Sequence, residues 1–275
     1  MTKYLHGLAL CFLVTLLGVF LSSLIGERLL GFDKSPISPI LLAIVIGVII
    51  SNTFTLHSKY KAGMQFASTY VLKTGVAILG IGISFMQILE VGRVVIPVVC
   101  ITIISGLLLA FVCKKIFNLD YKLATLIGVG TSICGATAIA ATSPIIDAKQ
   151  EHTAYAISVI AIFGTVAMSV YPYGVNYLFD SSLAKGIFLG SSIHDTSQVI
   201  GAGLIYTEQY GNSEVLDITT ITKLIRNSLM ALVIPFIAYF YYRININSES
   251  KNTAFDYKKA FPLFILFFIL LASVR

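Results

Sequence analysis

Two stretches decide the fold: GVGTSICGATAIAATSP at residues 128–144 and GSSIHDTSQVIGAG at residues 190–203. Both lie inside long apolar segments, yet both are rich in glycine and in hydroxyl side chains. Each glycine lowers helix stability by about 1 kcal/mol relative to alanine. Unpaired backbone groups are tolerated at membrane depth only where protein or a water-filled cavity surrounds them. Each stretch therefore predicts a broken helix at a membrane-embedded binding site.

The rest of the chain has the composition of an integral membrane protein. Of its 275 residues, 57% are hydrophobic and 12% are charged, and the mean hydropathy is +0.89. Soluble domains carry about 25% charged residues, so a soluble fold could not cover so much apolar surface. The net charge of +6 does not indicate a nucleic-acid partner, because the basic residues stand singly or in pairs between apolar stretches.

A crossing needs about 20 apolar residues, and on this template about nine segments are predicted to span the bilayer. We expect an all-α polytopic membrane protein with a single transmembrane domain over 1–275. The first segment is predicted to be an uncleaved span, because no A-x-A cleavage site follows it. The cysteines lie in or beside apolar runs, which predicts free thiols and neither a metal site nor a cofactor. The segments are 7–25, 36–51, 64–89, 94–112, 121–148, 153–171, 184–206, 218–242 and 260–274.

The basic residues predict a cytoplasmic N-terminus. In that orientation the acidic loop 207–217 lies outside. The fifth and seventh segments then run in the same direction, whereas inverted repeats require opposed broken helices. Either the two motifs are not equivalent, or one is re-entrant. The expected inside residues are Lys3, Lys59, Lys61, Lys114, Lys115, Lys122, Lys185, Arg243, Lys251, Lys258 and Lys259, and the outside ones are Arg28, Lys34, Arg93 and Lys149.

His194 and Asp195 form the most informative pair. A carboxylate inside a membrane costs roughly 2.5–3.5 kcal/mol on insertion scales, so it is a functional candidate by default. Histidine titrates near neutrality, so His194 is a candidate proton carrier, with Asp195 holding its charge or tautomer. Adjacent helical residues point apart, so direct pairing requires local unwinding. The alternative is a structural polar cluster satisfied by Ser191, Ser192, Thr196 and Gln198.

Three basic residues fall inside predicted spans. Lys73 either snorkels to the interface or faces the cavity as a counter-charge. Lys223 and Arg226 share a helical face at i and i+3, and they either clamp an anion or snorkel. The predicted substrate- or ion-binding set is Thr131, Ser132, Cys134, Gly135, Thr137, Ser191, Ser192, His194, Asp195, Gln198, Lys73, Lys223 and Arg226.

Four blocks resemble the YeiH-like family of bacterial membrane proteins, the UPF0324 type, whose sulfate-exporter label is provisional. The resemblance runs from about residue 36 to the last residue. It implies a bacterial inner-membrane transporter related to sodium/proton antiporter-like and bile-acid-symporter-like folds, with two repeats and crossing broken helices. The blocks are GTSICGATAIAATSPII (130–146), AYAISVIAIFGTVAMSVYP (154–172), GSSIHDTSQVIGAG (190–203) and TKLIRN (222–227).

The chain departs from the family in two places. Gly82 stands where the family often has an arginine, and family members run longer, so we expect this chain to lack their last one or two helices. Lys73 stands where the family tends to have a basic residue. The family motifs map onto Ser132, Cys134, Gly135, His194, Asp195, Gln198, Lys223 and Arg226.

The leading interpretation is a secondary transporter of a small anion, such as sulfate or a sulfonate, coupled to a proton or ion gradient. The lipid bilayer is its expected surrounding, and a homodimer is left open. No Walker motif supports coupling to ATP. The alternatives are a sodium-coupled organic-anion carrier, a channel or non-transporting scaffold, and an intramembrane enzyme using Cys134 or a hydroxyl with His194. No G-x-S-x-G or H-E-x-x-H signature supports an enzyme, so we expect none.

Overall fold

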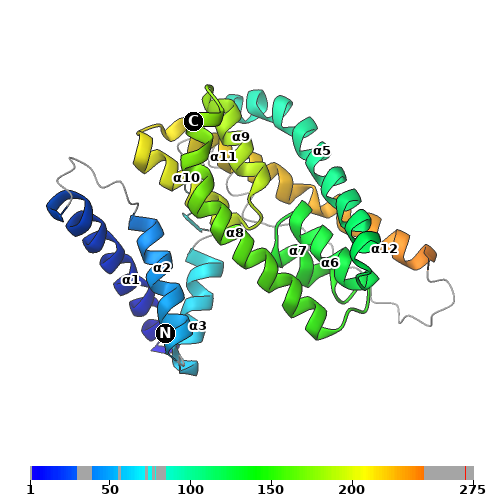
Figure 1. The fold of residues 1–275 in the computed structure, drawn as a ribbon, viewed down its shortest axis with the longest axis horizontal. Coiled ribbons are helices and arrows are strands. Elements are labelled where there is room, and N and C mark those ends of the chain that lie inside the picture. Colours follow the sequence, from blue (N-terminus) through cyan, green and yellow to red (C-terminus); the bar gives the residue numbers. More distant parts are fainter. Residues whose placement is uncertain are drawn as a thin grey trace.

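The computed structural model describes residues 2–29, 39–54, 57–71, 74, 75, 78, 85–244 and 270. Within these ranges all regular structure is helical (Figure 1). Four helices, Tyr4–Ser23, Ile88–Phe117, Gln150–Leu178 and Ser213–Tyr239, are long and apolar enough to cross a membrane. The prediction of an all-α membrane protein is thus confirmed in outline. Lys73, Gly82 and nearly all of the expected ninth segment lie outside the described residues.

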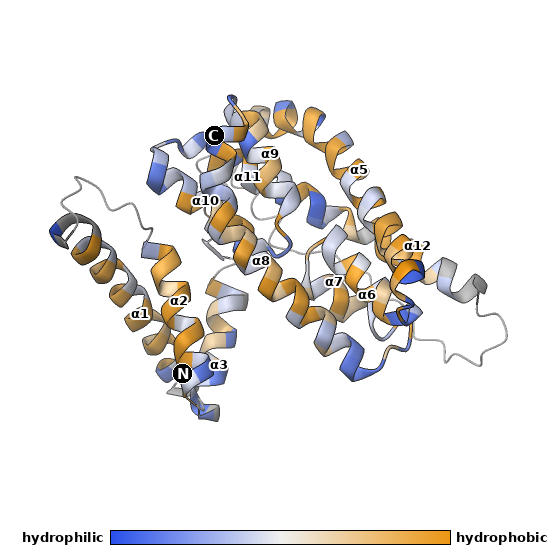
Figure 2. Cartoon of the chain, in the orientation of Figure 1, coloured by the Kyte–Doolittle hydropathy of each residue, from blue (hydrophilic) through white to orange (hydrophobic). Residues whose placement is uncertain are grey.

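The first three helices form a group of their own in Figure 1. They are α1 (Thr2–Ser23), which continues as a π-helical turn η1 (Leu24–Leu29), α2 (Pro39–Thr53), and α3 (Ser58–Phe66), which continues as η2 (Ala67–Val71). Two glycines let α1 and α3 touch, because a Cβ on Gly7 would lie 2.6 Å from the Cα of Gly63. Large apolar side chains of α1 stay exposed, as on a lipid-facing helix (Figure 2).

The remaining helices form a second group. They are α5 (Phe85–Phe117), α6 (Tyr121–Ser132), α7 (Ala136–Thr142), α8 (Gln150–Leu178), α9 (Ser182–Ser192), α10 (Thr196–Tyr210), α11 (Ser213–Ser228) and α12 (Met230–Ile244). In this group α11 packs against α5, α9, α10 and α12. Every residue of α11 from Ile218 to Leu224 is buried. A helix that is covered on all faces belongs to the core. α11 is therefore the helix against which the site is built.

The expected fifth span turns back on itself. α6 ends at Ser132, the chain reverses over three residues, and α7 returns beside it. Lys122, at the start of α6, donates to the Asp147 carbonyl and lies 3.6 Å from its carboxylate. The two ends of the segment therefore meet, and α6 and α7 form a helical hairpin. With 12 residues, α6 extends only about 18 Å, too short for a crossing.

The expected seventh span reverses in the same way. α9 ends at Ser192, and α10 carries the chain back to the beginning of α9. The Asn212 side-chain amide, just after α10, donates to the Ser182 hydroxyl at 3.0 Å. Neither segment runs straight through, whereas the sequence left open a reversal in one of them. The breaks occur where glycine and hydroxyl residues predicted them, but each break reverses the chain.

The two hairpins enter from opposite ends of α8. Near the start of α8, the His152 ring lies 3.4 Å from Asp120, at the base of the α6–α7 hairpin. Near its end, Asn176 accepts a hydrogen bond from Tyr206 of the α9–α10 hairpin at 2.9 Å. α8 has 29 residues and is therefore a rod of about 43 Å. The hairpins are therefore opposed, with Lys149 at the start of α8, beside the base of the first hairpin, and Lys185 near its other end.

Asp120 caps the first hairpin at its base. Its carboxylate accepts hydrogen bonds from the backbone N–H of Lys122 at 2.8 Å and of Leu123 at 3.2 Å. Burial raises the pKa of this carboxyl, but these hydrogen bonds and the charges of His152 and Lys122 outweigh burial and leave the pKa below its usual value. Protonation of Asp120 in acid should therefore weaken the cap at the base of this hairpin.

Candidate functional site

The tips of the two hairpins touch each other. The first tip turns at Gly135, which has φ +68° and ψ −127°, a conformation open to glycine but strained for other residues. A Cβ at Gly135 would lie 3.6 Å from the Cα of Asp195, at the second tip. The two sequence motifs, about 60 residues apart, thus meet at one point, as expected of a shared site.

Lys223 of α11 lies directly behind the tips and is fully buried, with 0% of its surface exposed. Its ammonium group donates to the carbonyl oxygens of Ile133 at 3.1 Å and Ile193 at 3.3 Å, and also to that of His194. These carbonyls follow the last turns of α6 and α9. A helix leaves its last carbonyls without partners, so Lys223 supplies the caps that water cannot.

Arg226, one turn further along α11, caps the same two helices and is 2% exposed. Its Nε donates to Ser132 at 2.9 Å, its Nη1 to Ser191 at 2.8 Å and Ile193 at 3.0 Å, and its Nη2 to Thr131, all through carbonyl oxygens. Helix C-termini carry partial negative charge, which favours a cation there. Neither basic residue snorkels, and both direct their donors at the hairpin tips.

His194 and Asp195 lie in the unwound segment, as direct pairing would require, but they are not paired. The Asp195 carboxylate accepts hydrogen bonds from Ser197, from its backbone N–H at 2.9 Å and its hydroxyl at 2.7 Å. Asp195 is thus the N-cap of α10, with Gln198 completing a capping box. The buried Nδ1 of His194 has no hydrogen-bond partner among the described residues.

Gln198 ties the second tip to α8. Its carbonyl accepts the Asp195 backbone N–H at 3.2 Å, and its amide donates to the Ala161 carbonyl at 3.1 Å and the Thr165 hydroxyl at 3.3 Å. Gly164 makes room for it, because a Cβ there would lie 2.0 Å from Gln198 Oε1. The sequence interpretation did not identify Gly164, whose role depends on a side chain more than 30 residues away.

Asn227 is a second residue that the sequence interpretation did not identify as part of the site. Its amide donates to the Thr196 hydroxyl at 3.0 Å, which fastens the start of α10 to α11. Its position directly after Arg226, within the TKLIRN block, was the available signal. α11 thus holds the second hairpin on both sides of its break.

Three further residues predicted to bind substrate make hydrogen bonds within the protein instead: Ser191, Ser192 and Cys134. The hydroxyls of Ser191 and Ser192 donate back to carbonyls of their own helix, Ile187 at 2.6 Å and Phe188. They therefore do not satisfy Asp195, as the polar-cluster alternative supposed. The Cys134 thiol is buried and donates to the Met230 sulfur at 3.4 Å.

Two hydroxyl candidates on the first hairpin differ in their surroundings. The buried Ser132 hydroxyl has no hydrogen-bond partner in the part of the chain that the structure describes. Thr137 is exposed on α7. Ser132 is the last residue of α6 and lies at the tip with the other candidates, whereas Thr137 lies within α7.

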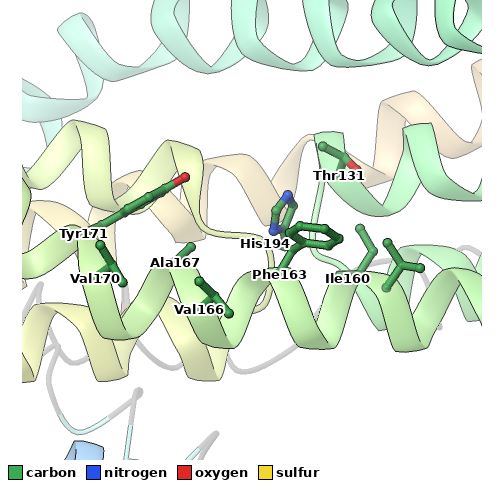
Figure 3. Close-up of a pocket in the computed structure, with 9 residues that line it drawn as sticks. Thr131, Ile160, Phe163, Val166, Ala167, Val170, Tyr171 and His194 are labelled. Carbon is green, nitrogen blue, oxygen red and sulfur yellow. The ribbon is translucent and has the colours of Figure 1, made fainter.

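A cavity of about 320 Å³ lies between the tips and α8 (Figure 3). This volume is at the lower end of the range for small-molecule sites, about 300–1,000 Å³. One residue from each tip, Thr131 and His194, faces α8 across it. The described residues that line it are Thr131, Val159, Ile160, Phe163, Val166, Ala167, Val170, Tyr171 and His194.

Comparisons with known proteins agree over nearly the whole chain. A family model described as conserved hypothetical protein 698 matches residues 6–275. The UPF0324 membrane protein SAG1125 of Streptococcus agalactiae is 37% identical over 264 residues, covering 96% of this chain and 75% of the relative. The UPF0324 membrane protein FN0533 of Fusobacterium nucleatum is 35% identical over 279 residues, covering 100% and 76%. No solved structure matches.

Proposed function

Because the chain belongs to the family of conserved hypothetical protein 698, the UPF0324 membrane proteins, we propose that it is a secondary transporter of a small anion. The family resemblance drawn from the four sequence blocks is confirmed. The names of the relatives give a membrane location and no substrate. The proposed substrates are sulfate or a sulfonate, and the proposed membrane is the bacterial inner membrane.

One observation carries this proposal: two opposed helical hairpins meet at a buried pair of cations. Non-helical backbone and charged side chains are both expensive at membrane depth, and they mark solute pathways where they occur. Hairpins that enter from opposite ends leave a central site bounded by one hairpin toward each side. This is the arrangement that alternating access to a central site requires.

The charges of the site support an anion as the solute. Lys223 places an ammonium group among three carbonyl oxygens, the kind of position that a coupling sodium ion occupies in other broken-helix carriers. Because Lys223 already donates to these carbonyl oxygens, they are not free to coordinate sodium, which disfavours the sodium-coupled alternative. Cys134, the candidate nucleophile of the enzyme alternative, has its thiol buried against Met230 and is not among the described residues that line the cavity.

The proposed orientation has the base of the first hairpin in the cytoplasm. Lys114 and Lys115 end α5 there, and Lys122 and Lys149 flank the hairpin. The opposite end carries the acidic loop 207–217, which has no basic residue. Basic loops stay inside, so this orientation agrees with a cytoplasmic N-terminus.

His194 is the proposed site of proton coupling, because its imidazole lines the cavity and an imidazole can both accept and donate a proton. The test is flux of radiolabelled anions into proteoliposomes, with and without an imposed pH gradient. We expect gradient-dependent uptake, and we expect His194→Gln to lose its pH dependence while the protein remains folded. His152→Gln is the matched control, since His152 lies at the hairpin base beside Asp120.

Three outcomes of this assay bear on the proposal. Folded protein that moves no anion under any gradient would refute the transporter. Full pH-dependent flux by His194→Gln would refute the proton role alone. Uptake that requires sodium would restore the sodium-coupled alternative.

A further inference from the structure

We infer that the cavity between the tips and α8 selects a monoanion with an apolar body, such as a short-chain or aromatic sulfonate or carboxylate, over the sulfate dianion. This inference rests on the proposed function, because it names the solute class of the same site. It follows from the cavity lining, the charges behind it and the arrangement of its walls.

The lining is mostly apolar. Three of the described lining residues, Thr131, Tyr171 and His194, carry polar side chains, and the other lining residues are aliphatic or phenylalanine. A charge that leaves water needs pairing or hydrogen bonds in return. The Thr131 hydroxyl and the His194 imidazole can coordinate one anionic head group, but they leave a dianion that has lost its water largely uncompensated. An apolar body, in contrast, gains from contact with the same walls.

The nearby charges also favour one negative charge. The Lys223 nitrogen donates to three carbonyl oxygens, as a protonated amine does, and Arg226 adds a guanidinium. Asp195 contributes one carboxylate, so one positive charge is in excess at the tips. The donors of both cations are directed at carbonyl oxygens, and neither residue is among those that line the cavity. The pair therefore attracts an anion through its field without becoming its direct ligand.

The positions of the lining residues along the cavity determine the orientation that we propose for the bound anion. In Figure 3, Thr131 and Ile160 lie at one end, His194 and Phe163 in the middle, and Tyr171 at the other end. We place the anionic head between the Thr131 hydroxyl and the His194 imidazole. The body then lies along α8, toward Tyr171.

The chain contains no tryptophan, so the fluorescence of a single introduced tryptophan reports on this site alone. Phe163→Trp puts one indole on the cavity wall. Ile162→Trp is the matched control, since Ile162 is the neighbouring residue on α8 with the same 63% exposure but does not line the cavity. The full chain in detergent is titrated with sodium sulfate, methanesulfonate, propanesulfonate and benzenesulfonate, and tryptophan emission is followed. The same salts then compete with labelled substrate in proteoliposomes.

We expect propanesulfonate and benzenesulfonate to shift the emission of Phe163→Trp and not of Ile162→Trp, and to bind at least about tenfold more tightly than sulfate. Methanesulfonate, with its smaller body, should fall between them. Sulfate that binds or is transported as well as the larger sulfonates overturns this inference and leaves the anion transporter standing. Absence of binding and of flux for every anion refutes the proposed function, and the inference with it.

Discussion

Gly164→Ala tests how the second hairpin tip is held to α8. The new Cβ would lie 2.0 Å from Gln198 Oε1, 2.7 Å from its Cδ and 2.9 Å from its Nε2. The amide is the end of a flexible side chain, so it can swing away from the methyl group. In doing so it gives up its hydrogen bonds to Asp195, Ala161 and Thr165.

The expected loss follows from these contacts. The three partly buried hydrogen bonds of Gln198 contribute about 1 kcal/mol each to stability. Replacing a helical glycine by alanine returns about 1 kcal/mol, so the variant should be destabilised by about 2 kcal/mol. For a protein of this size, the midpoint of thermal unfolding should fall by about 4–8 °C.

The assay is thermal unfolding in detergent, followed by size-exclusion chromatography of the heated sample. Gly174→Ala is the matched control on the same helix, because nothing lies within 4 Å of a Cβ at Gly174. It should keep only the gain in helix propensity and raise the midpoint by about 2–4 °C. The two substitutions are chemically identical and should act with opposite sign.

A second background makes the test sharper. Gln198→Ala removes both the clash and the hydrogen bonds, so adding Gly164→Ala to it should stabilise the protein by about 1 kcal/mol. The sign of the Gly164→Ala effect should therefore reverse between the two backgrounds. If Gly164→Ala stabilises the parent chain as Gly174→Ala does, Gln198 does not pack against Gly164 and the contact between tip and α8 is wrong.

Three further predictions concern the caps. Lys223→Met leaves the carbonyls of Ile133 and His194 uncapped, because Arg226 still donates to Ile193, and it should cost about 2–6 kcal/mol, seen as loss of monodisperse protein. Lys185→Met removes one hydrogen bond to Asn176 and should cost about 1 kcal/mol; equal yields would contradict the capping role. Gly135→Ala should lower the unfolding midpoint, because φ +68° costs a residue with a Cβ about 1–2 kcal/mol; an unchanged midpoint would exclude this turn. Folding lowers the pKa of Asp120, so the ionised carboxylate stabilises the protein fully at neutral pH, and this stabilisation is lost as the pH falls below about 4. In Asp120→Ala the unfolding midpoint should therefore depend less on pH over that range. The same pH dependence in the variant and the parent chain would rule out the cap.

The sequence predicted the membrane class and the positions of the breaks for a simple physical reason. Apolar length and glycine spacing are local properties, and both broken segments show them directly. The sequence also predicted that Lys223 and Arg226 lie on one helical face near the site. It did not predict their acceptors, because main-chain carbonyls of α6 and α9 have no signature in the side chains.

The sequence left open that one broken segment is re-entrant, but it did not predict a reversal at both breaks, for a related reason. A broken helix that crosses and one that turns back have the same composition, and only long-range contacts such as Asn212 to Ser182 distinguish them. One local signal was available. The Asp120 cap and Pro144 bound a segment whose break leaves α6 with 12 residues and α7 with 7, and neither is long enough to cross.

The capping arrangement limits how the proposed transporter can move. Lys223 and Arg226 bond to both hairpins from one helix, so separating either hairpin from α11 would leave buried cations and carbonyls without partners. Breaking a buried charged contact in this way costs several kcal/mol. The link from Gln198 to α8 consists of neutral hydrogen bonds, each about 1 kcal/mol. A motion that exposes the cavity to one side should therefore carry α6, α7, α9, α10 and α11 together and slide them against α8.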